Sequence, residues 1–403
     1  MGNPSLNPRY RKGFYSLFKT LQQNPRFALA PMINNGSTLA GYITEEDINY
    51  YTRRADVASL LISCATYVEV HGNSFGYGIG NYADDQLEGL TELAQAMKSK
   101  GNKAILQLYH PGREAKVTYE THGKVYGPST MEFDFLDYPV TGLTEEQVEN
   151  MIENFVSATD RAIEAGFDGV EIHGANHYLI QQFFSKTSNK RDDKWGGKLE
   201  NRARFGLEIV KRIQERIKEH KKDNFILGYR ISPEEIHGGN IGYTLDDSLY
   251  LIDKLADLGI DYIHSSKWGE EAYKAPAEMG KYKGESTNKV IYDLIRDRTA
   301  LVVVGDILTP EAAVDALNYG DIVALGSAVL FDPEFKNKIA EGKESEINFD
   351  VTKRYEDLAL PKHFPIMIAA VNASGEIPKS TFEVLKENTL DEDKKYIFSN
   401  KNI

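Results

Sequence analysis

The chain has 403 residues, with 47 lysines and arginines against 60 aspartates and glutamates, and its net charge is -13. This acidic balance disfavours nucleic acid and anionic membranes as partners, because both carry negative charge. The single cysteine, Cys64, excludes an intrachain disulfide, a cysteine-rich zinc site and a cysteine-ligated iron–sulfur cluster within this chain. Without an apolar run near the roughly 20 residues of a membrane span, or a signal-peptide core, we expect a soluble cytoplasmic protein.

Short apolar strands alternate with amphipathic helices along most of the chain, after a polar lead from Met1 to Asn24. The pattern predicts eight strands: Phe27–Met32, Ala58–Ser63, Lys103–Leu108, Gly169–Ile172, Phe225–Ile231, Asp261–Ser265, Leu301–Val304 and Ile322–Leu325. Helices are predicted at Gln86–Ser99, Thr144–Ala165 and Leu199–Glu219, and from Thr44, Thr244 and Thr309 onward.

Threonines mark several of these helix starts. Thr44 precedes three acidic residues, which the positive end of a helix dipole favours. The sequence TEEQ at 144–147 is a capping box, and Thr309 is followed by Pro310 in the first turn. Each of these helices follows a predicted strand, which supports regular strand–helix alternation.

Length alone allows either one large barrel or two ordinary domains. Eight strands alternating with helices, without the glycine-rich repeat of a doubly wound sheet, predict an α/β protein built on a single (β/α)8 TIM barrel. Two connections are too long to be simple links, Tyr109–Gly142 after strand three and Lys267–Ser286 after strand six, and such loops usually shape a site. We place the barrel at residues 1–340 and a C-terminal helical extension, anchored by Phe364–Val371, at residues 341–403.

The end of strand four carries the strongest candidates for chemistry. Residues just past the carboxyl end of a barrel strand face the active site. His173 and Asn176 each offer an N–H donor, and the two can converge on a substrate oxygen that gains negative charge. Tyr178 adds an O–H that can release a proton nearby. The alternative is that His173 is a structural histidine whose hydrogen bonds are made by neighbouring residues.

Strands seven and eight both end in glycine, at Gly305 and Gly326. In such barrels the loops after these strands commonly bind phosphate through backbone N–H groups, and glycine permits a close approach. Gln107, at the end of strand three, can donate to and accept from a planar heterocycle, and Arg230 would stabilise a reduced, anionic ring. Tight turns without a ligand, and a salt bridge of Arg230 at the barrel mouth, are the alternatives.

The stretch HGANHYLIQQFFSKTSNKRDDKWGGKLENR resembles the signature of the old yellow enzyme family of NAD(P)H-dependent, FMN-containing oxidoreductases. The segments ALAPM, QLYHPGR, YRISPEE, VVVGDI and VALGSAVLFDP follow in the family's order, so the resemblance covers Phe27 to Phe335. It implies a (β/α)8 barrel with FMN at the carboxyl ends of the strands. It also implies a ping-pong enzyme that takes a hydride from NADH or NADPH and reduces an electron-poor alkene of the α,β-unsaturated carbonyl type.

The resemblance also implies roles for particular residues. His173 and Asn176 would hold a substrate carbonyl or phenolate over the flavin, and Tyr178 would donate the proton. The implied FMN contacts are Gln107 and Arg230 at the pyrimidine edge and N1 region, Pro31 and Met32 at the strand-one wall, Ala65 near the ring, and Gly305, Gly326 and Ser327 at the phosphate. Two departures from the pattern are Ile33, where many members have Thr or Cys, and Ser327, where many have a phosphate-binding Arg.

Two other functions are compatible with the residues. The first is a non-redox, phosphate-binding lyase or isomerase, in which Lys267 after strand six would form a Schiff base. The second is a flavin-binding protein without turnover. The chain lacks the cysteine cluster and second nucleotide-binding domain of the longer iron–sulfur dienoyl-CoA reductases, so electrons are expected to come directly from a nicotinamide. No metal is expected, and the sequence leaves open the physiological alkene, the preferred nicotinamide and assembly into a homo-oligomer.

Overall fold

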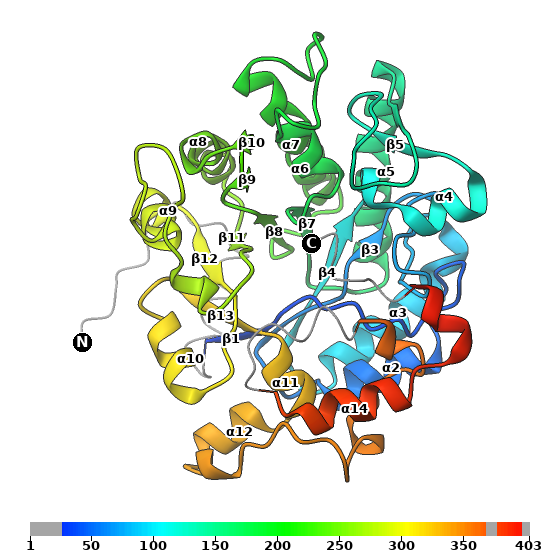
Figure 1. Ribbon diagram of the computed structural model, residues 1–403, viewed down its shortest axis with the longest axis vertical. Coiled ribbons are helices and arrows are strands. Elements are labelled where there is room, and N and C mark those ends of the chain that lie inside the picture. The colour runs from blue at the N-terminus through cyan, green and yellow to red at the C-terminus, as the bar shows by residue number, and fades with distance from the viewer. Residues whose placement is uncertain (1–25, 368–376, 397–403) are drawn as a thin grey trace.

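The computed structural model describes residues 26–367 and 377–396 of the chain (Figure 1). The predicted polar lead, part of the predicted apolar anchor and the last seven residues lie outside this range. Eight parallel strands pair in the order β2, β1, β13, β12, β11, β8, β7 and β4, and β2 also pairs with β4. That last pairing closes the sheet on itself, which confirms the single (β/α)8 barrel.

Every predicted barrel strand is present. The strands are β1 (Phe27–Leu29), β2 (Leu60–Ile62), β4 (Lys103–Tyr109), β7 (Gly169–Gly174), β8 (Ile226–Ile231), β11 (Tyr262–Ser265), β12 (Ala300–Val303) and β13 (Ile322–Leu325). A two-residue strand, β3 (Thr66–Tyr67), extends the ladder on β4. β1 ends earlier than predicted, since Pro31 has no N–H to give to a ladder. β7 runs on to Gly174 because it pairs with β8 over its whole length.

The helices are α2 (Glu45–Arg53), α3 (Leu87–Lys98), α4 (Lys116–His122), α5 (Glu145–Glu164), α6 (Leu179–Phe184), α7 (Leu199–Glu219), α8 (Leu245–Asp257), α9 (Thr287–Ile295), α10 (Pro310–Ala316), α11 (Ser327–Phe331), α12 (Phe335–Ala340) and α14 (Lys379–Glu387). The six helices predicted from the sequence are present as α2, α3, α5, α7, α8 and α10, each beginning within one residue of its predicted start, and the other helices were not predicted individually. The capping box of α5 is formed, because Gln147 N donates to Thr144 Oγ1 at 3.2 Å and Thr144 N donates to Gln147 Oε1 at 2.9 Å. None of the helices in the described ranges has the length and apolar character that crossing a membrane requires.

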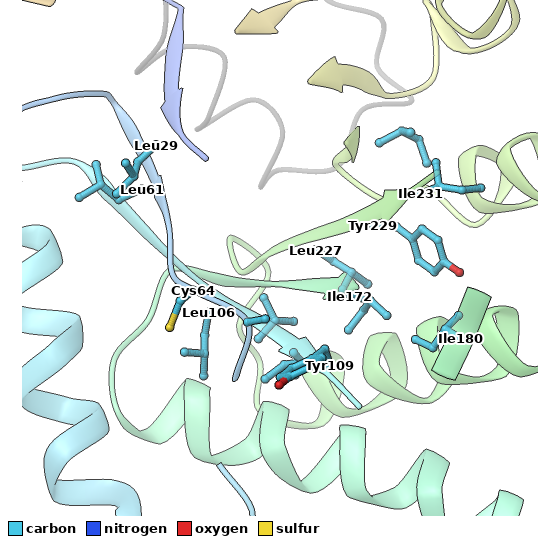
Figure 2. Packing of buried hydrophobic residues seen from close by; sticks show 14 of the residues in the cluster. Leu29, Leu61, Cys64, Leu106, Tyr109, Ile172, Ile180, Leu227, Tyr229 and Ile231 are labelled. Atoms are coloured by element: carbon cyan, nitrogen blue, oxygen red, sulfur yellow. The ribbon is translucent and has the colours of Figure 1, made fainter. Parts of the chain in front are cut away.

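Alternate residues of each barrel strand face two different layers. Outward-facing side chains such as Leu106, Ile172 and Leu227 pack between the strands and the surrounding helices (Figure 2). A separate apolar cluster fills the barrel interior and includes Tyr262. A Cβ built on Gly228 would lie 2.1 Å from the Tyr262 ring, so this glycine makes room for the tyrosine inside the barrel.

Both long connections predicted from the sequence lie at the carboxyl end of the barrel. The first contains α4 and a small sheet of β5 (Val125–Gly127) and β6 (Val140–Gly142), and the second contains a short 3-10 turn at Ala272–Lys274. A β-hairpin after β8, formed by β9 (Glu235–His237) and β10 (Asn240–Tyr243), was not predicted from the sequence. Its sequence signal is the pair Gly238–Gly239, a common two-residue hairpin turn.

The segment after α12 lies against the outside of the barrel near α2 (Figure 1). The fully buried guanidinium of Arg54 donates to Leu358 O at 2.9 Å and to Leu330 O at 3.1 Å, and Arg53 donates to Asp357 O at 2.9 Å. Two of these bonds join the segment to the end of α2, and the third joins Arg54 to α11. The division of the chain at residue 340 stays a prediction.

Candidate active site

Three of the predicted site residues lie on neighbouring barrel strands near their carboxyl ends. Gln107 is on β4, His173 on β7 and Arg230 on β8, and His173 and Arg230 are register partners. All three side chains are buried, with exposed fractions of 1%, 2% and 7%. The closed barrel therefore brings together residues that span more than a hundred positions of sequence.

His173 is held as a neutral hydrogen-bond donor. The backbone N–H of Ala175 donates to its Nδ1 at 3.2 Å, so the ring proton resides on Nε2. Burial, reinforced by the nearby charge of Arg230, holds the pKa of His173 well below its usual range. At neutral pH the imidazole thus offers one N–H without carrying a charge.

The orientation of Asn176 is also fixed by its neighbours. Its backbone has φ of 56°, a left-handed conformation that asparagine tolerates. Its Oδ1 accepts from Ser266 Oγ at 2.9 Å and from Trp268 Nε1 at 3.3 Å. Because an indole N–H can only donate, the atom facing Trp268 must be the oxygen, and the amide NH2 is left to donate elsewhere. Ser266 and Trp268 were not predicted as site residues from the sequence.

Tyr178 directly precedes α6 and packs against His173, with ring centroids 4.9 Å apart. Its ring also lies 5.0 Å from that of Tyr109. Burial raises the pKa of Tyr178 above its usual value, so the phenol keeps its proton at neutral pH. The structure therefore places the third predicted catalytic residue beside the first.

Two further polar residues, Glu171 and His264, occupy the barrel interior next to Gln107. Gln107 Nε2 donates to Glu171 Oε1 at 2.5 Å, and His264 Nδ1 lies 2.9 Å from Glu171 Oε2. Neither residue was predicted from the sequence. The available signal was a charged side chain two positions before His173 in an otherwise apolar strand, where alternate residues share a face.

The ends of strands one and eight adjoin each other. Pro31 and Met32 are half-buried just past β1, and a Cβ built on Gly326 would lie 3.4 Å from the Met32 sulfur, an ordinary contact distance. At Gly305, by contrast, a Cβ would lie 2.5 Å from Ala272 Cβ. The glycine at 305 is thus required by packing against the loop after β11, whereas Gly326 has room on its Cα side.

The remaining predicted contacts also lie at strand ends. Ala65 is buried beyond β2, Ser327 is the first residue of α11, and Ile33 is buried next to Met32. Lys267, the candidate Schiff-base residue, donates to Pro276 O at 2.9 Å and lies 3.3 Å from Glu234 Oε2. Its ammonium anchors the loop after β11.

The polar groups of this end suit a flavin. A flavin ring needs donors and acceptors along its pyrimidine edge and tolerates a cation near N1, which the Gln107 amide and the Arg230 guanidinium provide. Among the described residues, the buried Nε of Arg230 has no hydrogen-bond partner. A donor kept dry and unpaired in this position fits a group that binds from outside the chain.

Comparisons with known proteins point to flavin oxidoreductases. The sequence profile of the NADH:flavin oxidoreductase / NADH oxidase family matches residues 17–346. A probable NADH-dependent flavin oxidoreductase of Bacillus subtilis is 36% identical over 377 residues, which cover 93% of this chain and 99% of the relative. An uncharacterised oxidoreductase of Streptococcus pyogenes is 38% identical over 391 residues, covering 94% and 98%. The NADH:acrylate oxidoreductase of Vibrio harveyi is 39% identical over 83% of this chain, which spans 33% of that longer protein.

Solved structures of similar fold include members of the old yellow enzyme family. An old yellow enzyme homologue from Zymomonas mobilis superposes with a TM-score of 0.67 at 25% identity, covering 83% of this chain and 92% of that chain. Morphinone reductase in complex with tetrahydroNAD, at 23% identity and a TM-score of 0.67 over 89% and 92%, shares the fold. The family binds FMN and uses NADH or NADPH, which confirms the predicted cofactors. The chain belongs to the NADH:flavin oxidoreductase / NADH oxidase family, the old yellow enzyme family that its motifs predicted.

Proposed function

We propose that this protein is an ene-reductase that uses NADH or NADPH to reduce an alkene conjugated to a carbonyl group. The observation that carries the proposal is the arrangement of His173, Asn176 and Tyr178, two oriented N–H donors beside a protonated phenol. Two relatives support the substrate class. The NADH:acrylate oxidoreductase of Vibrio harveyi and the NADH:fumarate oxidoreductase of Klebsiella pneumoniae, 39% and 37% identical, are named for conjugated alkenes.

The residues at the carboxyl end of the barrel would hold the cofactor. In this proposal Gln107 and Arg230 contact the pyrimidine edge and N1 region, Pro31, Met32 and Ala65 line the ring, and Gly305, Gly326 and Ser327 contact the phosphate. Bound FMN would supply two-electron transfer between the nicotinamide and the alkene. Arg230 remains a cation even though burial lowers its pKa, so it would stabilise negative charge near N1.

His173 and Asn176 would act on the carbonyl oxygen. Negative charge develops on that oxygen as the alkene is reduced, and donors fixed in advance stabilise it without reorganising. Ala175 N–H fixes the His173 tautomer, and Trp268 N–H fixes the face of the Asn176 amide. Tyr178 would then deliver its proton to the α-carbon.

The alternatives receive less support from the geometry. A Schiff-base mechanism needs an accessible, uncharged lysine, whereas Lys267 is engaged by Glu234 and a backbone carbonyl. A flavin-binding protein without turnover would not need an oriented donor pair beside a protonated tyrosine. A cytoplasmic location, a small-molecule partner and a possible homo-oligomer stay predictions.

The visible spectrum of the purified protein tests the proposal first. We expect a yellow protein that releases FMN, identified by mass spectrometry, and whose absorbance is bleached by NADH or NADPH without oxygen. Adding 2-cyclohexenone, acrylate or fumarate should restore the absorbance. Bleaching that none of the three alkenes reverses would identify a flavoprotein without ene-reductase activity, and a colourless protein that takes up no FMN would contradict the whole proposal.

A further inference from the structure

A chain of three buried polar side chains crosses the barrel interior from β4 to β11. Gln107 Nε2 donates to Glu171 Oε1 at 2.5 Å, and His264 Nδ1 lies 2.9 Å from Glu171 Oε2. Glu171 and His264 have no exposed surface, and Gln107 has 1%. Burying a carboxylate is strongly unfavourable unless partners compensate for its lost hydration. This carboxylate therefore persists only because its neighbours are in place.

The charge states within this chain follow from the surroundings. Burial opposes ionisation of Glu171, but His264, Arg230 and Gln107 favour the carboxylate, and the net effect lowers its pKa. Burial lowers the pKa of His264, so at neutral pH this ring is uncharged and its Nδ1–H donates to Glu171. The cluster consequently contains one anion, Glu171, and one cation, Arg230.

The Glu171 carboxylate also determines the orientation of the Gln107 amide, that is, whether its nitrogen or its oxygen faces Glu171. An ionised carboxylate has no proton to give, so only the amide nitrogen can face it. The carbonyl oxygen of Gln107 is thereby turned away from Glu171 and is kept as an acceptor for a ligand. Without this anion, the Gln107 amide could flip, so that its nitrogen and oxygen exchange positions.

We propose that Glu171 is a positioning residue that fixes the Gln107 amide and offsets the charge of Arg230, and so sets the reduction potential of bound FMN, with His264 holding it in place. The inference deepens the proposed function, since it rests on Gln107 and Arg230 contacting the flavin. It assigns Glu171 no direct contact with substrate or cofactor. It also predicts a trade-off, because the anion that orients Gln107 disfavours additional negative charge nearby.

The variant Glu171→Gln tests this role, because it removes the charge with little change in volume. The reduced cofactor carries more negative charge, so its affinity relative to oxidised FMN should rise on the order of tenfold once Arg230 is no longer offset. For a two-electron couple this raises the midpoint potential by about 30 mV. The dissociation constant of oxidised FMN should increase severalfold as Gln107 loses its fixed orientation. Dye-equilibrated redox titration and equilibrium dialysis measure the two quantities.

The matched control is Asp261→Asn, which neutralises another buried carboxylate of the same barrel, immediately before β11 at the amino end. Its potential and FMN affinity should equal those of the wild type. A folded Glu171→Gln variant with wild-type potential and affinity, or one that shifts no more than the control, overturns the proposal.

A second variant, His264→Leu, removes the Nδ1–H donor and leaves Glu171 in place. The pKa of Glu171 should then rise, so the potential should increase above that of the wild type as the pH is lowered across the range in which both proteins stay folded. If Glu171→Gln does not fold, a His264→Leu potential equal to the wild type across that range overturns the proposal. Wild-type protein that binds no FMN would instead overturn the proposed function on which this inference depends.

Discussion

The two ends of the barrel use polar side chains for opposite purposes. At the amino end, aspartates stand immediately before β7, β11 and β13, and each carboxylate accepts a backbone N–H from a neighbouring strand. The bonds run from Ala104 N to Asp168 (3.1 Å), from Leu227 N to Asp261 (2.7 Å) and from Leu301 N to Asp321 (2.9 Å). These aspartates tie adjacent strands together.

At the carboxyl end, the polar side chains are held in fixed orientations, but some of their hydrogen-bonding atoms have no partner within the protein. Within the described residues, Arg230 Nε and His264 Nε2 are buried without a partner, and the Asn176 amide is turned so that its NH2 remains available. A buried polar atom without a hydrogen-bond partner lowers stability. Such an atom is consistent with a binding site, where a ligand supplies the missing partner. The difference predicts that, at neutral pH, substitutions at the carboxyl end alter chemistry more than stability, whereas substitutions at the amino end alter stability more than chemistry.

The largest effect should come from Tyr178→Phe. The variant loses the proposed proton donor and keeps the ring that packs on His173, so alkene reduction should slow by roughly 10² to 10⁴. Bleaching by NAD(P)H needs no protein proton and should be nearly unchanged. Stopped-flow measurement of each half-reaction checks this. Equal slowing of both, or of neither, would exclude Tyr178 as the donor, and Tyr109 would become the candidate.

Replacing His173 or Asn176 by Ala should slow alkene reduction by roughly 10² to 10³, the usual cost of one lost oxyanion donor. Binding of phenols, which place an oxygen at the same position, should weaken in parallel. FMN content and unfolding temperature should remain close to the wild type, which separates this end of the barrel from the other. Unchanged alkene kinetics in both variants would remove the pair from the mechanism.

The amino end supplies the opposite test. Asp261→Ala leaves Leu227 N without its acceptor inside the barrel, so the free energy of unfolding should fall by about 1 to 3 kcal/mol. The rate of alkene reduction per bound FMN should be unaffected at temperatures where the variant is folded. Denaturant unfolding with parallel kinetics measures both quantities. A loss of turnover without a loss of stability would break the proposed division between the two ends.

The stability of the protein should also depend on pH, because of two buried histidines at the carboxyl end of the barrel. Burial lowers the pKa of His173 well below its usual range and that of His177 to about 4. The unfolded chain binds these protons near pH 6.5 and the folded chain does not, so stability should fall as the pH decreases from about 6.5 to 4. Unfolding of wild type and His177→Gln at several pH values should show a shallower decline in the variant. Parallel declines would show that His177 does not contribute.

The smallest effect is expected from Trp268→Phe, which removes the indole N–H but keeps an aromatic ring. Asn176 Oδ1 keeps its bond from Ser266, so phenol affinity should fall about 2- to 10-fold, the value of one modest hydrogen bond. Combining Trp268→Phe with Ser266→Ala should weaken binding further than either change alone. Titration of the flavin absorbance with a phenol measures each dissociation constant. Wild-type affinity in the double variant would show that Asn176 is oriented by other contacts.

The sequence by itself determined the local features of this protein. Strand and helix alternation follows from residue periodicity, and the caps at Thr44 and Thr144 follow from side chains within one helical turn. His173, Asn176 and Tyr178 could be predicted as a group because one strand end and one turn hold all three, and their catalytic roles stay predictions.

Only the tertiary structure decided how these residues are supported. His264 lies 93 positions from Glu171, and Trp268 lies 92 positions from Asn176, so no local pattern connects them. The same holds for the two glycines: Gly305 is packed against Ala272 from another loop, whereas Gly326 has room, a difference that no feature of either strand end reveals. The barrel sets these contacts, because β7 and β11 both pair with β8 and the loops of separate parallel strands meet at one end.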